Sequence, residues 1–365
     1  MHLRINRAEL LTELTPMQGI VERKSTIPVL SHLLLRARDG KLHLAATDLD
    51  VSLTSWCEAE VKDEGALAVQ ARKFLEIIRA MVGEEVELDL EEESQLRIAA
   101  GRSRFKIHGL SAEDFPSLPE VADDEGIALP YADVKTMIGK VFFAVSAEES
   151  RFQLNGALLK LKDGALEMVA TDGHRLALVE TTQEGAVAAE GVLVPRKALQ
   201  ELQRFEGSEE LRFCRGEHHL SFRLGRRELI CRILEGTFPD YEKVISKDND
   251  KQVAFERKEL IDVVHRVALL TGDRARAVRL RLTDGQMVVS AANPDLGEAV
   301  EEVDCNYEGP EIELGINPDY LSQFLQAVGT DSVQLFLKDE NSQCVGAPVE
   351  GPDARYLCVI MPMRI

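Results

Sequence analysis

Similar elements recur in this chain at intervals of about 122 residues, so the fold must hold three related units. An Asp-Gly pair, the strongest short signal for a hairpin turn, stands at Asp39-Gly40, Asp163-Gly164 and Asp284-Gly285. Apolar residues typical of strands flank each pair. This recurrence predicts three domains of one architecture.

Two helical stretches accompany each hairpin. Apolar residues at helical spacing mark the first stretch of each unit (Leu10, Leu14, Met17 and Val21; Val134, Met137, Ile138, Val141 and Val145; Leu260, Val264 and Val267). They also mark the second stretch (Phe74, Ile77, Ile78 and Met81; Leu199, Leu202 and Phe205; Leu321, Phe324, Leu325 and Val328). We therefore expect an α+β fold in which two helices pack on antiparallel sheet in each unit.

Charged, linker-like stretches separate the units. The acidic residues 121–125 and the charged residues 246–251 interrupt the apolar patterning. They predict domains at 1–122 (N-terminal), 123–247 (central) and 248–365 (C-terminal).

The composition excludes several classes of protein. The six cysteines are scattered, which predicts reduced thiols rather than a zinc site or a disulfide framework. We expect no metal and no cofactor. The N-terminus has no signal-peptide core and no apolar run could cross a bilayer, so we expect a cytoplasmic protein without membrane contact. The net charge of −20 disfavours simple nucleic-acid binding.

One loop invites a catalytic interpretation. Asp172 and His174 lie close together, and His218-His219 offers further imidazoles. However, no nucleophile accompanies them and no Gly-rich phosphate loop follows a strand. A polar turn is the simpler interpretation, and no catalytic residue is predicted; an enzyme remains an alternative that an activity screen with His174→Ala would test.

Several longer motifs resemble the bacterial sliding clamp family, the β subunits of DNA polymerase III. They are Ala170-Thr171-Asp172-Gly173-His174-Arg175-Leu176-Ala177, Phe238-Pro239-Asp240-Tyr241, Val194-Pro195-Arg196-Lys197, Ser25-Thr26-Ile27-Pro28-Val29-Leu30, Gly101-Arg102-Ser103-Arg104-Phe105 and Val359-Ile360-Met361-Pro362-Met363-Arg364-Ile365. The resemblance covers all three units.

The resemblance implies a ring-shaped head-to-tail homodimer with the DNA clamp fold. Such a ring encircles duplex DNA without regard to sequence and is a non-enzymatic processivity factor. Its implied partners are DNA, a second copy of itself, the DNA polymerase III catalytic subunit, the clamp loader, repair polymerases and mismatch-repair proteins, the proteins binding through short peptides that contain Gln and Leu or Phe. The alternative is a monomeric clamp-like scaffold that binds proteins without encircling DNA.

The resemblance also implies a peptide-binding groove between the second and third domains. Flexible methionines and rigid prolines suit a groove that accepts several related peptides. The alternatives are an ordinary turn and an ordinary closing strand. The implied residues are Leu154, Thr171, Gly173, His174, Arg175, Leu176, Pro239, Lys243 (where many members carry arginine), Val244, Val359, Met361, Pro362, Met363 and Arg364.

Encirclement would let an acidic protein hold DNA through a local basic lining. Cations on amphipathic helices could make sequence-independent phosphate contacts, although a solvated helix face would look the same. By resemblance the DNA contacts are Lys24, Arg72, Arg79, Arg151, Arg196 and Lys197.

A head-to-tail dimer needs two different complementary surfaces. Cations alternate with apolar residues on a predicted strand of the first domain, and the third domain offers leucines at a helix end and an acidic run. The alternative is a basic strand in a monomer. The implied interface residues are Arg102, Arg104, Phe105 and Ile107 on one side, and Leu269, Leu270, Glu298, Glu301 and Glu302 on the other.

Overall fold

The computed structural model describes residues 1–22, 26–92, 94–122, 126–148, 150–183, 188–207, 210–272, 276–351 and 355–364. The chain packs into two compact units. Unit 1 contains residues 1–134 and 197–233, and unit 2 contains residues 135–196 and 234–365. The division runs through the predicted central domain because its strands join sheets of both units. The predicted boundaries at 122 and 247 therefore stay a prediction.

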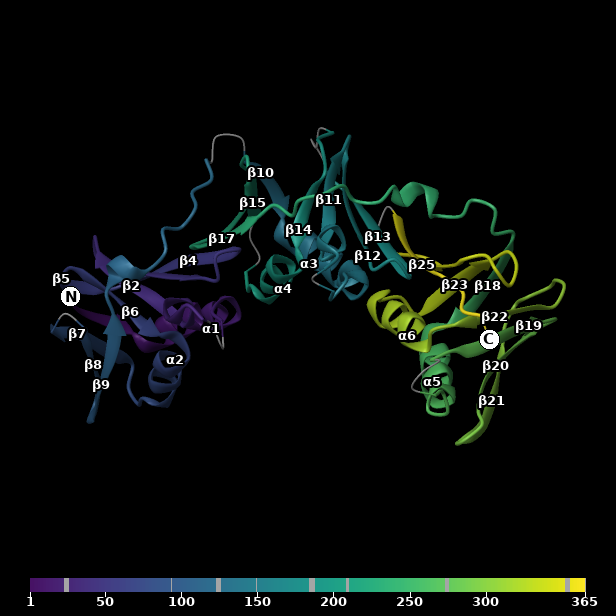
Figure 1. Cartoon of the computed structure of the whole chain (residues 1–365), viewed down its shortest axis with the longest axis horizontal. Helices are drawn as coiled ribbons and strands as arrows, with labels where there is room; N and C mark the ends of the chain where they lie inside the picture. The colour runs from purple at the N-terminus through teal and green to yellow at the C-terminus, as the bar shows by residue number, and fades with distance from the viewer. Residues whose placement is uncertain are drawn as a thin grey trace. The chain divides into compact units, whose positions relative to one another are not determined.

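Unit 1 is built on one sheet, which has thirteen strands within the described residues (Figure 1). In spatial order the strands are β10 (Ile127–Pro130), β15 (Glu210–Arg215), β16 (His219–Leu224), β17 (Arg227–Arg232), β4 (Val51–Glu58), β3 (Lys41–Thr47), β2 (His32–Arg38), β6 (Gly65–Gln70), β9 (Ser103–Leu110), β8 (Gln95–Ala100), β7 (Glu85–Glu92), β1 (His2–Asn6) and β5 (Glu60–Asp63). The antiparallel pair β17–β4 joins two distant segments of the chain.

Helices α1 (Arg7–Ile20) and α2 (Ala71–Ala80) pack against each other, and α1 also packs on β3 and β4. Each begins directly after a strand, where a side-chain oxygen caps free backbone N–H groups. Asn6 accepts from Ala8 and Glu9, and Gln70 accepts from Lys73. The apolar residues predicted for both helices are buried except Val21, which follows the end of α1 and is partly exposed.

Unit 2 contains two sheets. The larger, eight-stranded within the described residues, has the order β14 (Val192–Pro195), β11 (Gly156–Lys162), β12 (Ala165–Thr171), β13 (Arg175–Thr182), β25 (Arg355–Ile360), β24 (Cys344–Pro348), β23 (Ser332–Leu337) and β18 (Lys251–Glu256). The smaller is β21 (Gly297–Asp304), β20 (Gln286–Asn293), β19 (Val278–Thr283) and β22 (Ile312–Ile316). Helices α5 (Arg257–Ala268) and α6 (Pro318–Ala327) pack together.

Two helices begin at the division between the units, α3 (Tyr131–Val141) and α4 (Arg196–Arg204). Short 3-10 helices occur at η1 (Pro28–Ser31), η2 (Ala112–Asp114), η3 (Phe142–Ala144), η4 (Phe152–Leu154) and η5 (Tyr241–Lys243). The helix α3 ends four residues before Val145, which the periodicity placed on it, because η3 tightens the backbone there.

The three predicted Asp-Gly hairpins are confirmed. They connect β2 to β3, β11 to β12 and β19 to β20, all antiparallel pairs. Gly40, Gly164 and Gly285 adopt φ of 70°, 73° and 75°, a left-handed conformation that glycine adopts without steric cost. The three turns thus share one geometry. No helix among the described residues is long and apolar enough to span a membrane.

Candidate functional site

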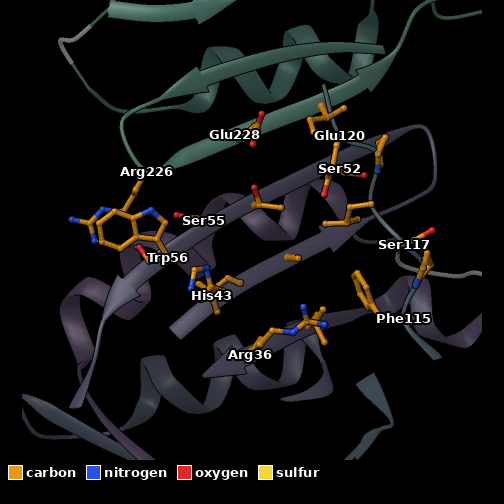
Figure 2. A pocket seen from close by; sticks show the side chains of 18 of the residues that line it. Arg36, His43, Ser52, Ser55, Trp56, Phe115, Ser117, Glu120, Arg226 and Glu228 are labelled. Carbon is orange, nitrogen blue, oxygen red and sulfur yellow. Dashed lines mark hydrogen bonds between the residues drawn. The ribbon is translucent and has the colours of Figure 1, made fainter. Parts of the chain in front are cut away.

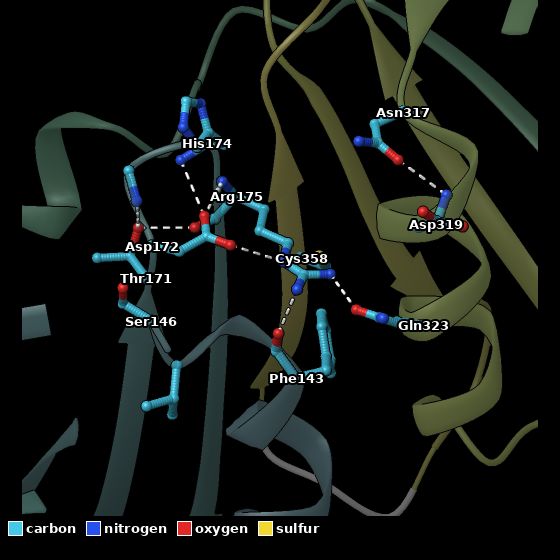
Figure 3. A network of polar contacts seen from close by, with 12 residues as sticks. Phe143, Ser146, Thr171, Asp172, His174, Arg175, Asn317, Asp319, Gln323 and Cys358 are labelled. Atoms are coloured by element: carbon cyan, nitrogen blue, oxygen red, sulfur yellow. Dashed lines mark hydrogen bonds and ion pairs between the residues drawn. The ribbon is translucent and has the colours of Figure 1, made fainter. Parts of the chain in front are cut away.

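The loop between β12 and β13 is a tight polar turn closed by its own side chains (Figure 3). The Asp172 Oδ1 atom accepts from the backbone N–H groups of His174 (2.9 Å) and Arg175 (3.0 Å). The Thr171 hydroxyl donates to the Arg175 carbonyl at 2.6 Å and accepts from the Gly173 N–H at 3.1 Å. Gly173 has φ of 88°, which explains glycine at this position. The turn leaves the His174 side chain exposed.

The Arg175 guanidinium joins this turn to helix α6 (Figure 3). Only 9% of Arg175 is exposed, and its Nε donates to Asp172 Oδ2 at 3.1 Å. Its other nitrogens donate to the Gln323 side chain and to the Phe143 carbonyl. The Tyr320 ring lies 4.3 Å from the guanidinium carbon. Arg175 is therefore a fixed structural centre of the loop, and its planar fork is well suited to several acceptors at once.

The C-terminal segment lies beside the same turn. Strand β25 pairs with β13, so that Val359 is opposite Leu176. Beyond the strand, the Met361 N–H donates to the His174 carbonyl at 3.0 Å, and the Met363 N–H donates to the Gly315 carbonyl of β22 at 2.9 Å. The backbone is thus held at both ends, whereas 43% of Met361 remains exposed.

The segment that follows Phe238 packs over the sheet formed by β13 and β25. Tyr241 and Ile245 belong to one buried apolar cluster with Leu176 and Val359. The neighbouring Val244 is 38% exposed, and Pro239 is also exposed. Buried anchors on either side therefore hold these exposed apolar groups in place.

Most of the groove residues implied by the resemblance lie around this junction, although the contacts differ among them. Described contacts connect the residues 171–176 with 359–363, and the buried cluster connects both with Tyr241. Leu154 is buried at the end of η4. The ammonium of Lys243 is exposed and pairs with Asp240 at 2.7 Å. Arg364 is exposed.

Sequence reasoning missed three residues of this site: Phe143, Tyr320 and Gln323. Each contacts the Arg175 guanidinium. Tyr320 and Gln323 lie at i and i+3 on α6, the helix whose apolar face was identified, so the neighbouring positions on that helix were the available signal. Nothing in the sequence indicated the Phe143 carbonyl.

The geometry gives no catalytic arrangement for Asp172 and His174. The Asp172 carboxylate is fully engaged by the turn and by Arg175. In unit 1, His218 precedes strand β16 and His219 begins it. Across the described residues no group of three or more His, Cys, Asp and Glu side chains could hold a metal ion.

The cations predicted to contact DNA have different surroundings. Arg72 is 74% exposed at its side chain and pairs with Glu76 on the same helix, and Arg79 is exposed too. Arg151 is exposed, and it pairs with Glu148 at 3.0 Å. Lys24 lies outside the described residues.

The last two predicted DNA contacts are Arg196 and Lys197, whose side chains form hydrogen bonds within the protein. Arg196 donates to the Val145 carbonyl at 2.8 Å, and burial lowers its pKa. Lys197 donates to the Asp48 carboxylate and to the Ile20 carbonyl at 2.6 Å. Neither charge is as available to phosphate as that of Arg72.

The residues predicted for dimerisation lie on two sheet edges. Residues 103–108 of β9 pair with β8 on one side, and no described strand pairs with them on the other. Strand β21 likewise pairs only with β20 among the described strands. Arg102, Arg104 and Phe105 are exposed, and Ile107 is partly exposed.

Beside β21, Leu269 is 68% exposed at the end of α5 and Leu270 is partly exposed. Glu298 and Glu302 are exposed, whereas Glu301 forms a two-point ion pair with Arg266 at 2.8 and 2.6 Å. Sequence reasoning missed two further apolar residues of this surface: Leu296 is 61% exposed and Val300 is 58% exposed.

Comparisons with known proteins agree along the whole chain. Residues 1–119, 128–240 and 242–364 match the family models for the N-terminal, central and C-terminal domains of the DNA polymerase III beta subunit. The beta sliding clamp of Pseudomonas aeruginosa is 36% identical over 370 residues, covering all of both chains.

Two solved structures are similar over the full length of both chains. The P. aeruginosa clamp bound to griselimycin has 35% identity and a TM-score of 0.94. The clamp of Bartonella birtlesii bound to griselimycin has 31% identity and a TM-score of 0.95. The α+β fold of three clamp domains is therefore confirmed, and this chain belongs to the DNA polymerase III beta subunit family, the beta sliding clamps.

Proposed function

We propose that the chain acts as a sliding clamp in the ring form: a homodimer that encircles duplex DNA and holds the replicative polymerase on it. The match of three successive family models along the chain carries this proposal. The clamp has no reaction of its own, needs no cofactor and works in the cytoplasm, where bacterial DNA is replicated. We further propose the domains 1–122, 123–247 and 248–365, although the C-terminal match begins inside the second of these.

Ring closure would join the two free strand edges. The β9 edge carries the cations Arg102 and Arg104, and the β21 edge carries Glu298 and Glu302. Opposite charges at a sheet edge favour pairing between unlike edges, with exposed apolar groups such as Phe105 and Leu269 at the centre. Such an interface is head-to-tail and closes a ring of two copies.

Encirclement explains how a chain of net charge −20 could remain on DNA. A closed ring needs little attraction per phosphate, and weak, sequence-independent contacts let it slide. The surroundings of Arg72 and Arg79 support them as DNA contacts, because both are exposed and, seven residues apart, lie on one face of α2. Arg196 and Lys197 are weaker candidates because their charges hold backbone carbonyls.

The groove at the β13–β25 junction would receive short peptides of the polymerase, clamp loader, repair polymerases and mismatch-repair proteins. Its support is the pair of exposed apolar groups, Met361 and Val244, next to a rigid loop. Two related clamps have been solved with griselimycin bound, which supports a ligand-accepting surface in this fold.

Retention on circular DNA tests the ring. The protein is loaded on nicked circular DNA with a bacterial clamp loader and ATP, and retention is measured by gel filtration in high salt. We expect retention on the circle and loss after the circle is cut, because a ring slides off an end. Equal retention on circular and cut DNA would support binding to the DNA surface without encirclement. Failure to be retained on either DNA would favour the monomeric scaffold.

Peptide affinity tests the groove. Fluorescence anisotropy with a labelled Gln-Leu-Phe peptide should show no binding after deletion of residues 361–365, with the dimer intact. The pair Val244→Ala and Met361→Ala should weaken binding about 30-fold, on the order of 2 kcal/mol. The control Val349→Ala, an apolar side chain as exposed as Met361 (43% each) and outside the proposed groove, should leave affinity unchanged. Retained affinity in the double variant would refute the groove.

A further inference from the structure

Unit 1 contains a pocket of about 800 Å³ that none of the proposed clamp contacts uses (Figure 2). Its floor is the face of β2, β3, β4 and β17, and its wall is the segment 112–121. Figure 2 shows Arg36, His43, Trp56 and Arg226 from these strands and their turn, with Phe115 and Ser117 on the wall.

The pocket is cationic although the protein is strongly acidic. Four arginines line it against two glutamates, whereas the whole chain has an excess of acids. One of the glutamates, Glu228, is already bonded to Arg223 at 3.0 Å and to the Ser221 hydroxyl at 2.7 Å. Arg36 and Arg38 are exposed, and neither guanidinium forms a hydrogen bond or ion pair with a described residue.

The single tryptophan of the chain lies in this pocket and is already contacted by cations. The Lys41 ammonium lies 3.6 Å from the centre of the Trp56 ring, and the Arg226 guanidinium lies 5.0 Å from it. These cations come from opposite neighbours of β4 in the sheet. Burial, Arg38 and Lys41 lower the pKa of His43, as expected where the local potential is positive.

The internal repeat provides a counterpart of this surface in unit 2. The β2–β3 pair sets Arg36 opposite His43, and the β11–β12 pair sets Lys160 opposite Glu167. The next strand continues each row, with Trp56 opposite His43 and Glu180 opposite Glu167. Thus Glu167 and Glu180 stand where unit 1 has His43 and Trp56.

Those two glutamates neutralise one cation of the counterpart, Lys162. Lys162, which corresponds to Arg38, donates to Glu167 and also to Glu180 at 3.0 Å. The Tyr241 hydroxyl donates to Glu167 as well. Unit 1 has Arg36 and Arg38 at the positions of Lys160 and Lys162 and neither acid, whereas its Arg226 pairs with Glu9 of α1.

In unit 2, side chains cover the surface that corresponds to the pocket of unit 1. Tyr241 and Ile245 pack there on Leu176 and Leu178 in a buried apolar cluster. At the corresponding positions of β4, unit 1 has Ser52 and Thr54, which line the pocket. Polar groups that converge on an open pocket can orient a polar ligand there.

We propose that this pocket binds an acidic peptide segment of a partner protein, whose carboxylates occupy the places that Glu167 and Glu180 fill in unit 2. A peptide suits the row from Arg36 to Arg226, which crosses four strands and therefore spans about 14 Å. Carboxylates accept well from arginine. A nucleic-acid base is disfavoured because Lys41 and Arg226 already cover the Trp56 ring.

Trp56 makes the test site-specific, because it is the sole tryptophan. The free full-length protein is titrated with hexaglutamate while tryptophan emission is recorded at low salt, without DNA or a clamp loader. We expect a saturable change. The variant Arg36→Glu with Arg38→Glu should bind about tenfold more weakly or worse, and tenfold corresponds to roughly 1.4 kcal/mol. The control Arg281→Glu, an exposed arginine on β19, should bind as the parent does.

A second variant tests the comparison between the units. His43→Glu places a carboxylate at the position that corresponds to Glu167 and should abolish hexaglutamate binding. His43→Gln adds no charge and should retain hexaglutamate binding. Circular dichroism confirms that each variant is folded. The proposal is overturned by an absent or unsaturable response, by unchanged binding in the double variant, or by a response to oligothymidylate stronger than to hexaglutamate. None of these outcomes bears on DNA encirclement.

Discussion

Leu49 adopts a backbone conformation that its side chain disfavours. Its φ is 82°, and Gly173 has 88° at the same place in the matching turn of unit 2. The two turns contain an equivalent hydrogen bond. The Asp48 carboxylate accepts from the Val51 N–H at 2.7 Å, and the Asp172 carboxylate accepts from the Arg175 N–H. A left-handed conformation costs a leucine about 1–2 kcal/mol.

Replacing Leu49 by glycine should therefore stabilise the protein. Relief of strain outweighs the extra entropy of the unfolded glycine, leaving a net gain of about 0.5–1 kcal/mol. Urea unfolding followed by circular dichroism measures the change. Leu49→Ala keeps the Cβ atom and should bring no gain; equal stabilisation by alanine and glycine would exclude strain as the cause.

The cysteines should be inert towards alkylation in the native protein. Burial raises the pKa of Cys57 and of Cys344 to about 12, so that hardly any reactive thiolate exists at neutral pH. After brief exposure to N-ethylmaleimide at pH 7.5, mass spectrometry should find label on Cys305 at most, the one cysteine that is not buried. Raising the pH to 9 should not label Cys57; rapid labelling would show that its site opens.

At the scale of elements, a buried ion pair fastens α1 to β17. The Arg227 Nε donates to Glu13 Oε2 at 2.8 Å, and the Ser55 hydroxyl donates to the same oxygen at 2.6 Å. Arg227 is 7% exposed and Glu13 is 3% exposed. Removing either partner leaves the other charge buried without compensation.

Arg227→Met should lower the free energy of unfolding by about 3–5 kcal/mol. Adding Glu13→Leu should recover most of that loss, since the double variant buries no lone charge. A double-mutant cycle from chemical denaturation gives the coupling. Additive effects of the two changes would mean that the pair does not act as a unit.

Local sequence patterns predicted the hairpins and helices but not which distant strands pair with each other. The Asp-Gly turns and the apolar periodicity of α1, α2 and α6 depend on neighbours within one element, so sequence spacing reveals them. The pairs β17–β4 and β13–β25 join segments far apart in the chain, and no spacing rule encodes such a partner.

The same limit applies to the candidate site. The turn at Thr171 to Arg175 and the terminal segment were identified through the family resemblance. Phe143, Tyr320 and Gln323 were missed because they act through contacts with one guanidinium. A carbonyl that accepts a hydrogen bond carries no residue signature at all.

At the scale of the molecule, the proposed dimer depends on exposed apolar groups at the β21 edge. Changing Leu269 and Leu270 together to alanine should yield monomers, with a dimer dissociation constant raised about 30-fold or more, roughly 2 kcal/mol. Sedimentation velocity measures this. Val349→Ala, exposed elsewhere in unit 2, serves as the control. An unchanged dimer in the double variant would place the interface elsewhere.

The charges on the two free edges also determine which pairings are forbidden. If two copies of β9 paired, the arginines Arg102 and Arg104 of one copy would lie beside those of the other. If two copies of β21 paired, the glutamates Glu298 and Glu302 would likewise lie beside each other. Exposed strand edges otherwise invite indiscriminate aggregation, which like charges suppress. In the proposed dimer, the edges therefore favour pairing of β9 from one copy with β21 from the other, and contacts between like edges, including amyloid-like stacking, are repelled.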